Sequence, residues 1–151
     1  MKNILVRLAA LVVALVMAAS FMVACKDETE EAPLPPAPDT RYSLEGFTIV
    51  REDGVANSVS RTVSDLKEAI ETKLGVSLAV ATDSDKEAGD KEILIGETSR
   101  AESTSTIKYI KKQEKKNSWA IRIAPGKIVI TGTDDASTAK AVEMFISEYV
   151  L

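Results

Sequence analysis

An apolar run at the N-terminus limits what this chain can fold into more than any other feature of the sequence. Lys2 and Arg7 are its only charges, residues 8–16 form its apolar core, and small residues follow. The single cysteine of the chain, Cys25, stands where the run ends and polar sequence begins. A basic start, an apolar core and a small-residue exit are typical of a secretion signal. Residues 1–24 are therefore predicted to be a signal peptide that takes no part in the folded domain.

The end of this signal, Met-Val-Ala-Cys at 22–25, resembles a lipobox, in which a small residue precedes a cysteine that is acylated and becomes the new N-terminus. Met22 stands in place of the usual leucine. The resemblance implies a bacterial lipoprotein that binds membrane lipid through Cys25. The alternative is an uncleaved anchor, because the run is about as long as the ~20 residues that span a bilayer. Both interpretations predict an extracytoplasmic domain held at the cell membrane or cell surface.

Residues 25–41 have no apolar periodicity and are predicted to be a tether. An acidic stretch at 27–31 is followed by four prolines between 33 and 38. Prolines favour extended polyproline geometry, a semi-rigid spacer of about 3 Å per residue. This segment would hold the folded domain, predicted at 42–151, away from the lipid surface.

Charge and composition exclude several classes of function. The chain has 19 basic and 23 acidic residues, and two of the basic ones lie in the signal, so the remainder carries a formal net charge of −6. An acidic protein is a poor candidate for binding nucleic acid. The absence of histidine removes the commonest general base and every histidine-dependent metal site. The sequence assigns no catalytic residue, no metal and no cofactor.

Residues 42–151 alternate between strand and helix patterns. Short strands are predicted around 47–50, 78–80, 92–95, 119–123 and 128–130, with a turn at Pro125-Gly126 between the last two. Apolar residues at helical spacing predict a helix from 59 to 74, ended by Gly75, and a last helix capped by Asp134 or Asp135. The segment 106–112 is a candidate for a further short helix. The predicted fold is a two-layer α/β (α+β) sandwich: a mixed sheet of about five strands, two main helices on one face, order β-α-β-β-β-β-α.

Alternation along the strands makes a prediction about the second face of this sheet. If the isoleucines of the strands point at the two helices, then Val50, Leu94 and Val129 point the other way. An exposed apolar patch of this kind is a candidate interface. The alternative is that scattered small apolar residues lie on an ordinary open face. Trp119 falls in the alternation of the fourth strand and is predicted to belong to the core.

The order of these segments resembles a known domain family. The pieces "FTIV", "EILIGETSR", "WAIRI" and "KIVITG" follow one another between Phe47 and Gly132, and a closing helix comes after them. They are similar to the N-terminal accessory domain of β-N-acetylhexosaminidases and α-glucuronidases, over nearly all of 42–151. The resemblance implies a non-catalytic α/β module, since in those glycoside hydrolases the chemistry belongs to the barrel that follows.

The loop after the third predicted strand is the candidate ligand site. Glu97, Thr98, Ser99 and Arg100 follow Gly96 there; an arginine can grip a carboxylate, and hydroxyls can bond to sugar. The alternative is that the loop caps the strand and turns the chain. Two further clusters could bind a ligand. The lysines between 108 and 116 could contact anionic polymer or lipid headgroups, although a solvated surface is the simpler interpretation. The acids between 83 and 87 match only part of a calcium-binding loop.

Two functions remain open on the sequence. One is a surface-tethered, non-catalytic module that binds cell-surface polysaccharide or an envelope protein. The other is the truncated N-terminal part of a glycoside hydrolase whose catalytic barrel is absent from this chain.

Overall fold

The computed structural model describes residues 42–113 and 115–151. The predicted signal peptide, Cys25 and the tether lie outside the described residues, so lipidation and cleavage stay predictions. Within the described ranges, no helix is both long enough and apolar enough to cross a membrane.

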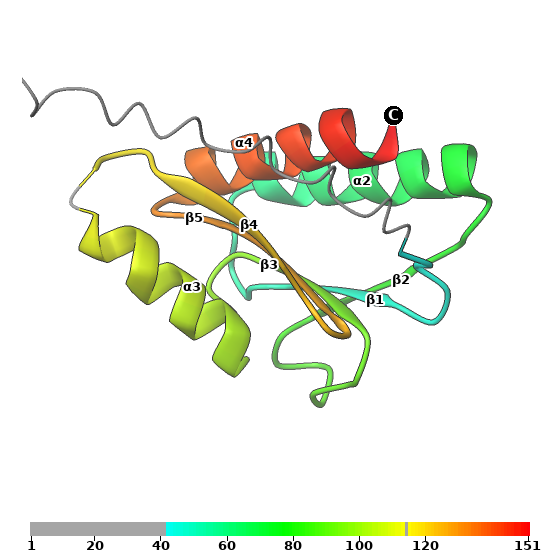
Figure 1. Cartoon of the computed structure of the whole chain (residues 1–151), viewed down its shortest axis with the longest axis horizontal. Helices are drawn as coiled ribbons and strands as arrows, with labels where there is room; N and C mark the ends of the chain where they lie inside the picture. The colour runs from blue at the N-terminus through cyan, green and yellow to red at the C-terminus, as the bar shows by residue number, and fades with distance from the viewer. Residues whose placement is uncertain (1–41, 114) are drawn as a thin grey trace, which may run out of the picture. The chain divides into compact units, whose positions relative to one another are not determined.

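A five-stranded mixed sheet forms the centre of this domain (Figure 1). The strand order is β2-β1-β3-β5-β4. The first four strands in this order run parallel, and β4 pairs antiparallel with β5. The bounds are β1 Thr48–Arg51, β2 Ala79–Thr82, β3 Glu92–Ile95, β4 Trp119–Ala124 and β5 Lys127–Gly132. The predicted mixed sheet of five strands is confirmed, and so is the β4–β5 hairpin.

Two helices cover one face of the sheet, as predicted: α2 (Asn57–Leu74) and α4 (Asp135–Phe145), the latter continued by a π-helical turn, η1 (Ile146–Val150) (Figure 1). Gly75 ends α2 in the left-handed conformation, φ 68°, which glycine adopts without strain. Asp134 begins α4, because its carboxylate accepts a hydrogen bond of 2.7 Å from the Ser137 N–H.

The main core lies between these helices and the sheet. Three strands contribute buried residues to it, namely Ile49 of β1, Ile93 and Ile95 of β3, and Ile128 and Ile130 of β5; Phe47, just before β1, joins them, and Ile121 of β4 packs at the margin. One prediction about this core is wrong. Trp119 is 40% exposed, because it begins β4, an edge strand with no neighbour on its outer side among the described residues.

The second face of the sheet is closed rather than open, and this corrects the predicted interface. Val50, Leu94 and Val129 do point away from the main core, but all three are completely buried and form a second apolar cluster. The cover is a third helix, α3 (Ala101–Lys112), which packs on β5 and β4, together with the segment between β2 and β3 that Arg100 holds in place. In Figure 1, α3 lies across the sheet from α2 and α4.

Helix α3 starts five residues earlier than the candidate segment 106–112. Its buried residues, Ser103, Thr106, Ile107 and Ile110, repeat at helical spacing. Two of the four residues are polar, so the apolar pattern that would predict this helix is weak, although all four residues are buried.

Candidate functional site

The predicted ligand loop at 97–100 ties β3 to α3. Ser103 Oγ donates to the Gly96 carbonyl at 2.6 Å and accepts from the Thr98 N–H at 3.1 Å. Thr98 is buried, whereas Glu97 and Ser99 are exposed. These contacts match the strand-capping interpretation of the loop.

Arg100 is occupied within the protein. Its side chain is only 6% exposed and forms ion pairs with Asp83 and with Glu92, the latter at 3.3 Å. It also donates to the carbonyl oxygen of Lys86 at 2.6 Å. A ligand carboxylate would have to displace these partners, so the guanidinium acts here as a brace between α3 and the segment before β3.

Glu92 is the centre of this buried ion cluster. Its side chain is completely buried at the start of β3 and accepts bonds from the Gly89 N–H at 2.9 Å and from Lys127 Nζ at 2.5 Å, in addition to Arg100. Burial by itself raises the pKa of this carboxyl, but the hydrogen bonds from Lys127, Gly89 and Arg100 outweigh it and lower the pKa below the ordinary value of 4.5.

The lowered pKa of Glu92 predicts a loss of stability in acid. A carboxyl whose pKa is lowered by folding stabilises the protein above its unfolded-state pKa, and this contribution is lost as the pH falls through the folded-state pKa. We expect the free energy of unfolding, measured with urea, to decrease as the pH falls below about 4.5. In the Glu92→Gln variant this part of the decrease is missing, so the two proteins should converge in acid. A difference that stays constant from about pH 6 to pH 3 would contradict the assignment.

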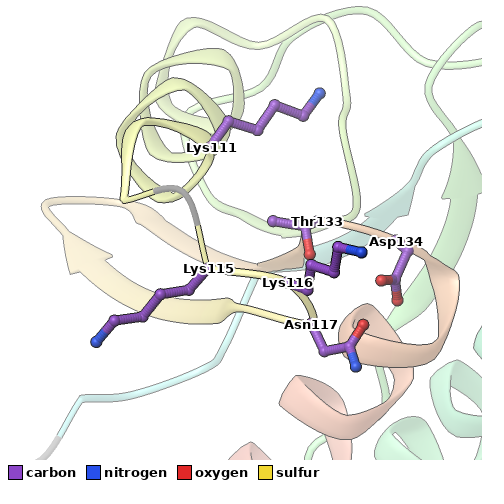
Figure 2. Close-up of a pocket in the computed structure, with 6 residues that line it drawn as sticks. All are labelled: Lys111, Lys115, Lys116, Asn117, Thr133 and Asp134. Carbon is purple, nitrogen blue, oxygen red and sulfur yellow. The ribbon is translucent and has the colours of Figure 1, made fainter.

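Lysines in the last turn of α3 and just after it line a shallow pocket of about 380 Å³ (Figure 2). It is formed by Lys111, Lys115, Lys116, Asn117, Thr133 and Asp134. Lys111 is paired with Glu97 at 2.8 Å. In Figure 2, Lys115 points away from the other labelled side chains, whereas Lys116 points toward the side of the pocket that carries Asp134. Lys111 is thus neutralised by Glu97 and Lys115 is turned away, which leaves Lys116 as the lysine of this lining that could face an anion.

A second hollow of about 500 Å³ lies between α3 and β4. It is lined by Ser105, Thr106 and Tyr109 of the helix and by Ala120, Ile121 and Arg122 of the strand. The Tyr109 side chain is 65% exposed, and Arg122 donates to Ser105 Oγ at 3.2 Å. We call this hollow the α3–β4 groove. An aromatic ring, a guanidinium group and hydroxyl groups all line this groove.

A third hollow, of about 570 Å³, separates α2 from the β1–β2 edge of the sheet. It places Glu68 and Glu71 of the helix near Arg51 and Lys67. Its lining contains both acidic and basic side chains, and no two of them are placed as the acid and base of a catalytic pair.

The acids that imitate a calcium loop have other roles. Asp83 binds the Ser99 N–H at 2.6 Å as well as Arg100, and Asp85 accepts from Thr82 Oγ1 at 2.5 Å. Among the residues that the structure describes, no three acidic, cysteine or histidine side chains are placed to hold a metal ion.

Sequence reasoning missed the α3–β4 groove because it left the first half of α3 unassigned and treated the lysines of its second half as the only feature there. The signal was present: Ser105 and Tyr109 stand four residues apart, which places them on one helix face. Their strand partner, Arg122, could be placed opposite them only once the helix was known to cross β4.

Comparison with known proteins found no matching family model and no matching curated protein. The likeness to glycosidase accessory domains therefore rests on the sequence segments quoted for it and stays a prediction.

Proposed function

We propose that the protein is an extracytoplasmic lipoprotein, anchored through lipid on Cys25, whose folded domain is a non-catalytic module that binds cell-surface polysaccharide. The observation that supports binding most directly is the α3–β4 groove, with Tyr109 largely exposed above it. The sequence supports the anchor, through the apolar signal that ends at the only cysteine.

The chemistry of the groove suits a sugar. Sugar rings present apolar C–H faces and a rim of hydroxyl groups, so they bind where an aromatic side chain lies beside donors and acceptors. Tyr109 offers a ring face, Arg122 offers N–H donors, and Ser105 and Thr106 contribute hydroxyls at the edge of the same hollow. The groove is also more suitable than the loop at 97–100, because Arg100 is buried and its guanidinium already bound.

The Tyr109→Ala variant tests this proposal. We expect it to weaken oligosaccharide binding by about 1.5 kcal/mol, roughly tenfold in Kd, because a contact residue at the centre of a site is removed. The measurement is an amide NMR titration with cell-wall and hemicellulose oligosaccharides, in which the shifts should centre on α3 and β4. Tyr42→Ala is the matched control, since Tyr42 is 59% exposed outside the groove.

Two results would contradict the assignment. Binding that Tyr109→Ala leaves unchanged would place the sugar elsewhere, and shifts centred on residues 97–100 would return the site to the loop predicted from the sequence. Indifference to every sugar would favour the remaining candidate partner, an envelope protein.

A further inference from the structure

We propose that two copies of this chain associate through the outer edge of β4, in antiparallel register about a two-fold axis at Ile121, so that their two sheets become one. This inference does not depend on the proposed sugar site. It rests on four properties of β4: its free edge, its exposed apolar side chains, the direction of its backbone groups and the charges at its two ends.

Among residues 42–113 and 115–151, no segment pairs with the outer edge of β4. β4 stands last in the sheet order, and α3 and α4 both pack mainly on its inner neighbour β5. Folded proteins usually protect such edges by shortness, proline, bulges or charged side chains, lysine above all. The other edge strand, β2, has only four residues, whereas β4 has six, carries Arg122 as its one charge, contains no proline, and keeps an unbroken register with β5.

The apolar side chains of β4 lie in one row. Trp119, Ile121 and Ile123 face the same side of the sheet, because they pair with Gly132, Ile130 and Ile128 of β5. Trp119 is 40% exposed and Ile123 39% exposed. Two large apolar residues are thus left to solvent at the two ends of one short strand.

The backbone groups that face outward belong to these same residues. The Thr133 N–H donates to the Ser118 carbonyl at 2.8 Å, so Ser118 turns its hydrogen-bonding groups toward β5. In an antiparallel pair this direction alternates from residue to residue. The even-numbered residues of β4 therefore bond to β5, and the N–H and C=O groups of Trp119, Ile121 and Ile123 point to the free edge.

Only one centre of symmetry satisfies all of these groups. With the axis at Ile121, Ile121 pairs with itself and Trp119 pairs with Ile123 of the second copy. Each of these pairs can exchange two backbone hydrogen bonds, and Trp119 and Ile123 come to lie side by side on the same face. A shift of the register by one residue would pair backbone groups that point to the free edge with groups that point toward β5, so hydrogen bonds would be lost. It would also place apolar side chains opposite Arg122.

The charges at the two ends of β4 are complementary in this arrangement. The strand begins just after Lys115 and Lys116, in a segment that carries five lysines between 108 and 116. Its other end, the turn at Gly126, lies against Asp90: a Cβ on that glycine would come within 2.3 Å of the Asp90 carbonyl oxygen. In the segment 83–91, Asp90 and Glu87 are exposed, and four acids outnumber Lys86 and the exposed Lys91. Antiparallel pairing brings the lysines of one copy toward these acids of the other.

A disulfide test reads the register directly. Full-length chains carrying Cys25→Ser, so that an introduced cysteine is the only thiol, are prepared in mild detergent with either Ala120→Cys or Arg122→Cys, each with its own tag. In the proposed register Ala120 faces Arg122 of the second copy in a non-hydrogen-bonded pair, with Cα atoms about 4.5 Å apart, within reach of a disulfide. Like residues are diagonal neighbours, about 8 Å apart and out of reach.

We expect copper–phenanthroline oxidation of the mixture to yield a disulfide that joins the two tags, and neither variant alone to yield a dimer. Adding Ile123→Lys to both chains should abolish the mixed disulfide, since it places a charge beside Trp119 of the second copy. Val80→Lys is the matched control, because Val80 is 42% exposed on the opposite edge strand, and it should leave the yield unchanged. Absence of the mixed disulfide, equal dimer from either variant alone, or indifference to Ile123→Lys would overturn the proposal. Because the readout is a disulfide and not sugar binding, its failure is distinct from failure of the proposed function.

Discussion

Replacing Glu92 with glutamine is expected to lower the free energy of unfolding at neutral pH by about 3–5 kcal/mol. Glu92 is the shared anion of two buried cations: Arg100 and Lys127 have side chains only 6% and 12% exposed. An amide keeps the shape of the side chain but not its charge. The variant would leave Lys127 with the Gly89 carbonyl but no carboxylate partner, in a site that is mostly closed to water.

Glu97→Gln is the matched control for this experiment. Glu97 also pairs with a lysine, at 2.8 Å, but both side chains are about half exposed. Exposed ion pairs contribute little, so the expected loss is below about 1 kcal/mol. Urea denaturation of the three proteins measures both effects. Equal losses in the two variants would show that the cluster around Glu92 does not behave as a buried one.

Replacing Leu94 with alanine is expected to cost about 2–5 kcal/mol. Leu94 lies on the face that the sequence leaves open and the structure closes, and it is completely buried between Val50 and Val129. Its truncation removes apolar contacts and leaves a cavity that the closely packed neighbouring residues fill only in part.

The experiment separates the two accounts of this face. If α3 and the segment before β3 cover it, Leu94→Ala causes a large loss in urea denaturation and Val80→Ala, on the exposed edge strand, causes little. If the face were open, the two substitutions would have similar and small effects. If Leu94→Ala retained full stability, the face would be open to solvent, as strand alternation alone predicts.

Much of the fold could be predicted because its signals are local. The spacing from Val59 to Ile70 makes α2 amphipathic whatever surrounds it. Gly75 ends this helix because the backbone there has a positive φ, which glycine adopts without strain. Asp134 starts α4 because its side chain accepts a hydrogen bond from the first turn of the helix. Each of these features is decided by residues within a few positions of one another.

The candidate site depended on contacts between distant segments. Arg100 looks available in the sequence, but Asp83 and Glu92, 17 and 8 positions away, occupy its guanidinium. Tyr109 and Arg122 give no joint signal, because a helix and a strand must first pack before their side chains can line one groove.

By itself, the sequence determined the five strands in their order, the C-terminal end of α2, the start of α4, the β4–β5 hairpin and the side of the sheet to which strand residues point, since alternation and capping act over short distances; it left α3 as a candidate segment at 106–112. Only the tertiary structure decided which surfaces stay exposed. Val50, Leu94 and Val129 follow the predicted alternation and are nevertheless buried, whereas Trp119 follows it and is not. The physical reason is that alternation fixes the side of the sheet to which a side chain points, and burial depends on which remote segment packs there: α3 packs over β5 and β4, and nothing in the described chain packs over the outer edge of β4.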